Sequence, residues 1–312
     1  PNTYKTGIGI NYAVPRWQTG LAFQTEPVGG FGQSVSSVNA NGNQSRNNGS
    51  GDIGWQGIGR ISGRPWMIDE TKFWHFGVSA GHTTVNNQYR ADGTFSQANA
   101  TAGQNSGGMS FVGFLGTNVD RTNVLNTGNL TSGSNDSPDA RRIDSYDRYG
   151  AETALVYGPF SAQAEYLRTN INGLNYSGEH LTGYYGYLSY FLTGESRAYH
   201  VRNGAWNRIV PNKSFHWNGT GLGAWEFAVG YDYLNMNNGK IRGGEADMIR
   251  FALNWYPHTH VRVMTNVNHV LNLNTAGVVN YNAAGEPIAN DRSQGFHDAN
   301  ITSFLTRVQV DF

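Results

Sequence analysis

The residues with the clearest chemical potential in this sequence are basic side chains that alternate with small or apolar residues. Such a position projects to one face of a β-strand, because successive strand residues point to opposite faces. A wall of aligned cations attracts anions and removes only part of their hydration shell, so that the ion can also leave. The basic residues predicted to share one face are Lys5, Arg60, Arg64, Arg148, Arg250, Arg262 and Arg307.

Carboxylates occupy the same predicted faces, at Glu152, Glu165, Glu226, Asp232 and Asp311. Each arginine therefore has two possible roles. It either pairs with a neighbouring carboxylate or stays free to interact with a passing anion. The alternation of residue types is compatible with both roles.

Other groups of reactive residues give weaker signals. His258 and His260 stand two positions apart on a short turn, where a solvated imidazole is more common than a metal ligand. Asp136 and Asp139 lie in a polar run that is typical of a loop. No glycine-rich nucleotide motif and no G-x-S-x-G motif occurs between a strand and a helix. We therefore expect no enzyme, no bound metal and no other cofactor.

The composition narrows the class of protein. The 22 basic residues balance the 22 acidic ones, and the chain contains no cysteine. A neutral chain has no long-range field to attract nucleic acid, and the lack of thiols excludes disulfides and thiolate metal sites. The 41 glycines and 13% aromatic residues favour strands joined by polar loops.

The hydropathy of the chain leaves its relation to a membrane open. The sequence has no apolar run of about twenty residues, which a transmembrane helix requires. A strand that crosses a membrane needs only about ten residues of alternating polarity. Hydropathy alone therefore does not separate a soluble β protein from a membrane one.

Period-two alternation predicts eleven strands, at 6–12, 17–23, 53–63, 72–83, 147–157, 159–170, 180–192, 222–234, 246–256, 259–271 and 301–312. Short turns at 14–16, 65–71, 157–160 and 257–259 alternate with polar stretches at 26–51, 84–146, 171–179, 235–245 and 272–300. This alternation is typical of an up-and-down barrel with short turns at one rim and long loops at the other. The long connection at 193–221 breaks the pattern, because it falls at the rim of short turns.

The two faces of the predicted strands differ in polarity. Trp225 and Phe227 share one face, and Glu226 lies on the other. Aromatic residues also gather near strand ends, as Trp255 and Tyr256 do, which is where rings lie at a membrane interface. This distribution favours lipid on one face and water on the other.

Five segments carry a resemblance to a known family: GPFSAQAEY (158–166), GYYGYLSYFLTGESRAY (183–199), GAWEFAVGYDYLNM (223–236), FALNWYPHTHVRVMTNVNHV (251–270) and TRVQVDF (306–312). In their order and spacing they resemble the phosphate-selective porins of types O and P. Looser matches precede them in GIGINY, GRISGRPW and VDRTNVLNTGN. The resemblance implies a homotrimer of sixteen-stranded transmembrane barrels in the bacterial outer membrane, surrounded by lipid and lipopolysaccharide, that conducts small anions.

We therefore expect residues 1–312 to form one all-β barrel domain. Eleven strands is an odd number, so we expect either further amino-terminal strands or a strand overlooked in 84–146. The resemblance implies that some connections fold into the lumen, which suggests this role for the extracellular loop 84–146 and the periplasmic connection 193–221. Glu195 and Arg197 would then form an ion pair that anchors 193–221, or a solvent-exposed pair.

The expected function is passive diffusion of small solutes with a weak preference for anions. The family's phosphate selectivity depends on an arginine ladder in the region that corresponds to 108–129, and Arg121 is the only basic residue there. This departure argues against phosphate specificity. The alternative from another class is a plugged barrel with a structural or adhesive role at the cell surface. A soluble β-sandwich lectin is a more distant alternative.

Overall fold

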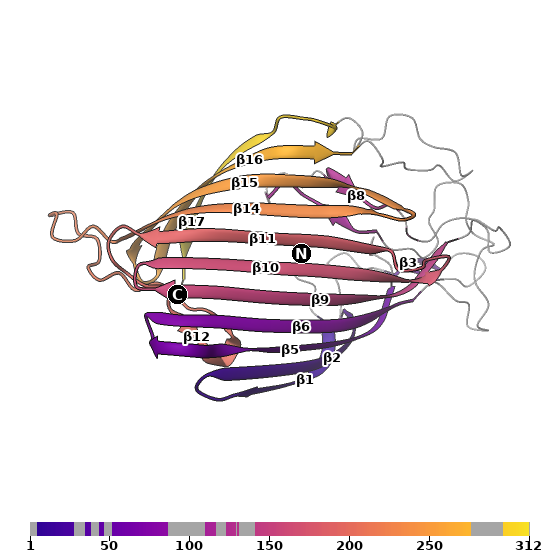
Figure 1. The fold of residues 1–312 in the computed structure, drawn as a ribbon, viewed down its shortest axis with the longest axis horizontal. Helices are drawn as coiled ribbons and strands as arrows, with labels where there is room; N and C mark the ends of the chain where they lie inside the picture. Colours follow the sequence, from indigo (N-terminus) through magenta and orange to yellow (C-terminus); the bar gives the residue numbers. More distant parts are fainter. Residues whose placement is uncertain are drawn as a thin grey trace.

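A computed structural model describes residues 5–27, 35–38, 44–46, 52–86, 110–116, 123–128, 130, 141–275 and 296–311. Its main feature is one eleven-stranded antiparallel sheet in the order β1-β2-β5-β6-β9-β10-β11-β14-β15-β16-β17. Figure 1 shows these strands side by side in a single curved wall. Each strand pairs with the next one along the sheet, so the topology is up-and-down, and the all-β class and the eleven strands predicted from the sequence are confirmed.

The sheet strands are β1 Lys5–Ala13, β2 Trp17–Pro27, β5 Asp52–Asp69, β6 Lys72–Asn86, β9 Arg142–Tyr157, β10 Phe160–Leu174, β11 His180–Phe191, β14 Ala224–Asn238, β15 Ile241–His258, β16 Val261–Asn274 and β17 Thr302–Val310. Three short pairs lie outside the sheet: β3 Val35–Val38 with β4 Gln44–Arg46, β7 Val112–Gly113 with β8 Leu125–Asn126, and β12 Tyr199–His200 with β13 Ala205–Trp206. A single turn of 3-10 helix, η1 Val201–Asn203, separates β12 from β13. No helix in the described residues is long and apolar enough to cross a membrane.

Several strands are longer than the sequence predicted. β5 and β15 each contain 18 residues, and the predicted turn at 65–71 is reduced to two residues because Trp66 still pairs with Trp74. The polar stretch predicted at 235–245 is likewise mostly strand, with a turn only at 239–240, and strand β10 takes up the first four residues of the stretch predicted at 171–179. The prediction placed loops at these positions because their residues are polar. The strands nevertheless continue there, because backbone hydrogen bonds between two strands form as long as both strands extend equally far.

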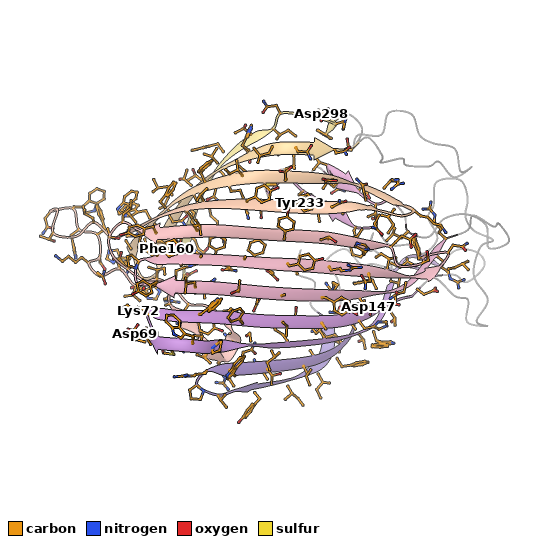
Figure 2. All side chains as sticks on the ribbon, viewed as in Figure 1. Asp69, Lys72, Asp147, Phe160, Tyr233 and Asp298 are labelled. Atoms are coloured by element: carbon orange, nitrogen blue, oxygen red, sulfur yellow. The ribbon has the colours of Figure 1, made fainter. Side chains whose placement is uncertain are left out.

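The ends of the sheet are not joined in the described residues. β1 pairs only with β2 and β17 pairs only with β16. Figure 2 shows Lys72 and Phe160 at the end of the sheet where the short turns lie, and Asp147 nearer to the opposite end. We refer to these as the short-turn end and the long-loop end.

The turn between β10 and β11 at the long-loop end is built around a buried carboxylate. Glu179 is 5% exposed, and its Oε2 accepts the backbone N–H of Ser177 at 2.6 Å. The backbone N–H of Lys240 donates to Oε1 at 3.4 Å. Burial raises the pKa of Glu179, but these hydrogen bonds and the charge of Lys240 outweigh it, so the pKa lies below its usual value.

Replacing Glu179 by glutamine is expected to lower the free energy of unfolding by about 1–3 kcal/mol at neutral pH, because the backbone N–H groups of Ser177 and Lys240 lose a charged acceptor and one carboxylate oxygen is replaced by a donor. A carboxyl whose pKa is lowered by folding stabilises the protein above its unfolded pKa of about 4.3 and loses that contribution as pH falls through the folded value. Unfolding curves of the two proteins should therefore converge in acid. Curves that stay equally separated at every pH would contradict this account.

Candidate functional site

The cross-strand register divides the sheet into two faces of opposite character. Phe227 pairs with Leu253 and Val229 pairs with Phe251, so these side chains share one face, which we call the outer face. Its other members include Ile8, which is 74% exposed, and Phe304, which is 71% exposed. A sheet that exposes large apolar side chains on every strand of one face is adapted to a lipid environment.

Aromatic residues form two belts on the outer face. At the short-turn end Trp225 and Trp255 stack with ring centroids 5.5 Å apart, and at the long-loop end Tyr184 stacks on Tyr233 at 4.8 Å. Tyr231 belongs to the second belt and lies six residues after Trp225 on β14, which corresponds to about 20 Å of strand. This separation approaches the apolar band of about 25 Å found in outer-membrane barrels.

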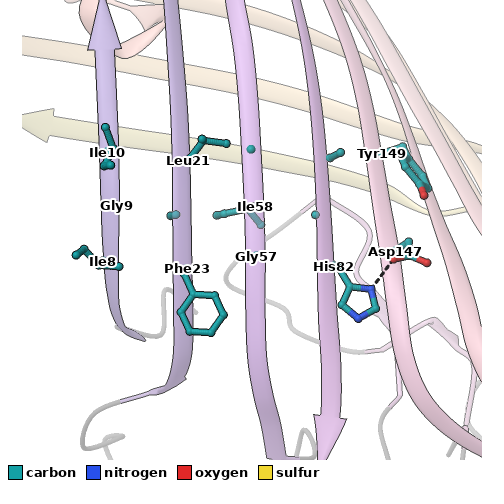
Figure 3. A pocket seen from close by; sticks show the side chains of 14 residues that line it. Ile8, Gly9, Ile10, Leu21, Phe23, Gly57, Ile58, His82, Asp147 and Tyr149 are labelled. Carbon is teal, nitrogen blue, oxygen red and sulfur yellow. Dashed lines mark hydrogen bonds and ion pairs between the residues drawn. The ribbon is translucent and has the colours of Figure 1, made fainter.

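A shallow hollow of about 590 Å³ lies on the outer face between β1 and β9. Figure 3 shows Ile10 and Leu21 on one side of it and Tyr149 on the other, with Gly57 between them. The hollow exists because Gly57 and Gly59 place no side chain there. Its lining is mostly apolar, with the His82–Asp147 contact of 2.7 Å at one edge. It lies on the face opposite to the predicted arginines, so it is not part of the surface described next.

The opposite face, which we call the inner face, carries the predicted arginines, and three of them are neutralised. Arg60 forms an ion pair with Glu152, and Arg250 forms one with Asp232. Arg64 is 2% exposed and bonds to Glu70 at 2.5 Å. These three arginines are therefore occupied by carboxylates of the chain.

Two other arginines of the inner face have neutral neighbours. Arg262 donates from Nε at 3.1 Å and from Nη2 at 2.7 Å to Oε1 of Gln309. Arg307 lies across from Met264 in the register of β16 and β17. In the part of the chain that the structure describes, neither arginine has an ion-pair partner. Arg250, Arg262 and Arg307 lie on the three consecutive strands β15, β16 and β17, and the positive strip on this part of the wall consists of the last two.

The remaining predicted residues have separate surroundings. Arg148 lies over the ring of Tyr146, 5.4 Å from its centroid. Glu226 is 4% exposed and accepts hydrogen bonds from Asn254 at 3.0 Å and Tyr256 at 2.8 Å. Lys5 begins β1, but its side chain lies outside the described part, as does all of Arg121.

The chain between β11 and β14, residues 192–223, lies with its part around 199–206 against the inner face near the short-turn end, whereas Trp217 farther along is 95% exposed. Trp206 donates from Nε1 to Gln163 of β10 at 2.7 Å, and the Tyr199 hydroxyl contacts Nδ1 of His75 on β6 at 2.8 Å. Asn11 of β1 donates to the backbone oxygen of Arg202 at 3.2 Å. The segment therefore crosses the inner side of the sheet from β10 to β1.

Glu195 and Arg197 do not form the ion pair that the sequence suggested. Glu195 is 4% exposed and accepts the backbone N–H of Asn212 at 2.9 Å, together with the hydroxyl of Thr193. Arg197 turns the other way, stacks on Trp206 at 4.2 Å and donates to the Tyr187 hydroxyl. The two side chains separate because each finds a better-placed partner than the other.

A second segment covers the inner face at the long-loop end. Val124 and Leu125 are 3% and 2% exposed and belong to one apolar cluster with Met248 of β15 and Val270 of β16. Phe111 packs against the same cluster. The described parts of 84–146 thus contribute apolar side chains to the inner side of the sheet.

Neither His258 nor His260 has the surroundings of a metal ligand. His260 contacts the Arg208 guanidinium at 2.8 Å, and His258 lies 6.4 Å from the His216 ring at a steep angle. No group of three or more potential metal ligands occurs among the residues that the structure describes.

Sequence reasoning missed the residues that hold the chain 192–223. His75 alternates with Phe73 and Gly77, so its position on the inner face could have been read from period two. Tyr199 and Trp206 lie in irregular chain without a period, and Gln163 showed no charge to single it out. Contacts of this kind join residues distant in sequence, which no local pattern predicts.

Comparison with known proteins agrees with this geometry. The family model described as phosphate-selective porin O and P matches residues 59–279. A stretch of 164 residues is 32% identical to an uncharacterized protein of Caulobacter vibrioides and covers 53% of this chain and 30% of that protein. A stretch of 127 residues is 32% identical to Porin O of Pseudomonas aeruginosa and covers 37% of this chain and 27% of that porin. The chain thus spans about a third of the length of these relatives.

Proposed function

Because this chain belongs to the family of phosphate-selective porins O and P, we propose that it forms an outer-membrane pore through which small solutes diffuse, with a weak preference for anions. Porins of this family are channels of the bacterial outer membrane rather than enzymes. The observation that carries the anion preference is the pair Arg262 and Arg307 on the inner face, which face the neutral residues Gln309 and Met264.

The preference is weak because most of the inner charge is compensated. Arg60, Arg64 and Arg250 are paired with carboxylates, and Glu226 adds a negative charge held by neutral donors. The field of two remaining arginines raises the local anion concentration but is screened over about 8 Å at physiological ionic strength. We expect no saturable phosphate site, since the segment 108–129 contains one basic residue.

The assembly and surroundings follow from the same proposal. A homotrimer in the outer membrane would place some of the apolar outer face against neighbouring copies and the rest against lipid and lipopolysaccharide. The closed barrel would have sixteen strands, as in the family. Small anions are the proposed solutes, and phosphate is one of them.

One observation favours the second candidate function, a plugged barrel with a structural or adhesive role. Two segments lie on the inner face, the apolar one around Leu125 and the polar one around Tyr199. Together they would narrow a closed barrel at both ends. The two functions differ in whether an open path for solutes remains through the barrel.

Single-channel recording in a planar lipid bilayer tests the proposal. We expect discrete conductance steps and, in a salt gradient, a reversal potential on the anion-selective side. A protein that inserts without any steps would support the plugged barrel. Block of the chloride current by low concentrations of phosphate would contradict the expected absence of a saturable phosphate site.

A further inference from the structure

One carboxylate on the inner face, that of Glu152, contacts an arginine and a histidine side chain at once. Oε1 of Glu152 on β9 accepts from Nε of Arg60 at 3.1 Å and also contacts Nε2 of His75 at 3.0 Å. The three residues come from adjacent strands β5, β6 and β9. A shared acceptor fixes the orientation of both donors, because each loses its bond if it rotates away.

Both side chains held by Glu152 also bind the chain 192–223 to the wall. Nη2 of Arg60 donates to the backbone oxygen of Gly204 at 2.8 Å, and Nδ1 of His75 contacts the Tyr199 hydroxyl at 2.8 Å. These attachment points lie on either side of η1. Glu152 therefore controls both points without touching the segment itself.

The direction of the hydrogen bond at Tyr199 follows from the other ring nitrogen of His75. The Glu152 carboxylate, paired with Arg60, only accepts hydrogen bonds, so Nε2 of His75 carries the proton that it donates to Glu152. In the neutral imidazole Nδ1 is then the acceptor, and the Tyr199 hydroxyl donates to it. The ring of Tyr199 is further held between Phe73 at 5.5 Å and the Arg64 guanidinium at 5.0 Å.

The local backbone provides space for this arrangement at two glycines. Gly77 lies across from Glu152 in the register of β6 and β9, and a Cβ there would collide with the carboxylate. Gly204 has a positive φ of 56° and is buried, and a Cβ on it would lie 2.6 Å from the Ser62 hydroxyl. The wall and the segment thus approach each other as closely as glycine allows.

We propose that Glu152 is a positioning residue that fixes the chain 192–223 against the inner wall through Arg60 and His75. The proposal rests on the proposed function only in taking the inner wall to be the wall of a pore. The contacts themselves do not depend on conduction.

A spin label on the segment tests the proposal, because the chain contains no cysteine of its own. Arg202 is exposed, so Arg202→Cys offers a labelling site next to the two attachment points. In lipid vesicles we expect the label to give an immobilised spectrum in the otherwise unchanged protein. Adding Glu152→Ala should make the mobile component dominant, and adding Gly77→Ala should do the same by displacing the carboxylate.

Asp232→Ala is the matched control, because Asp232 is also an inner-face carboxylate paired with an arginine but, among the described residues, forms no hydrogen bond with the segment. We expect the immobilised spectrum there. An immobilised label in both Glu152→Ala and Gly77→Ala, or equal mobility in the control, would overturn the proposal. The spectrum is recorded without ion flow, so a failure of the proposed pore function would appear only in the bilayer recordings.

Discussion

Replacing Phe251 by arginine is expected to lower the free energy of unfolding in a lipid bilayer by about 2–4 kcal/mol. Phe251 is 41% exposed on the outer face and lies between Val229 and Val267 of the neighbouring strands. An arginine at this level would lose its hydration and find apolar neighbours on both sides. The measurement is denaturant unfolding of the protein refolded into phospholipid vesicles.

The next residue on the same strand gives the matched control. Ala252 points to the inner face, between Ala228 and Asn266. Ala252→Arg should cost much less, because its charged group reaches water or polar side chains. Equal destabilisation by Phe251→Arg and Ala252→Arg would show that the outer face does not meet lipid. A register shifted by one residue would reverse the order of the two effects.

Replacing both Arg262 and Arg307 by glutamate is expected to turn the proposed anion preference into a cation preference. Arg262 donates to the neutral Gln309, and Arg307 faces Met264 across the strands. Neither arginine forms an ion pair in the described part of the chain, although Asp311 accepts a hydrogen bond from Gln309 at 2.7 Å. Their charges therefore act on permeating ions, and the double change replaces two positive charges by two negative ones. Reversal potentials in a potassium chloride gradient measure the result, and Arg262→Ala alone should give an intermediate value.

A neutral double variant controls for structural effects of altering the wall. Arg250→Gln with Asp232→Asn removes an ion pair and leaves the net charge unchanged, so the sign of the reversal potential should persist. The contrast between wild type and the glutamate variant should shrink in 1 M salt, where the screening length is about 3 Å. Anion selectivity that survives both charge reversals would exclude this strip as its source.

The sequence by itself determined the strands and their two faces. Alternation of apolar and polar residues with period two is a direct consequence of strand geometry, so Trp225 and Phe227 could be placed on the opposite side from Glu226 without any coordinates. The same pattern gave eleven strands, as the structure has them. Strand ends were less predictable, because hydrogen-bonded pairing continues into polar residues such as those of β15 beyond the apolar band.

Only the tertiary structure decided which charges are free. Arg60 and Glu152 are 92 residues apart in the sequence and meet because β5 and β9 both flank β6. Arg250, by contrast, could have been matched with Asp232 only once the register of β14 and β15 was known. His75 and Tyr199 are 124 residues apart, and their contact depends on where an irregular segment comes to rest. Period two fixes the face on which a side chain lies, whereas its partner depends on strand register and on chain that folds back from elsewhere.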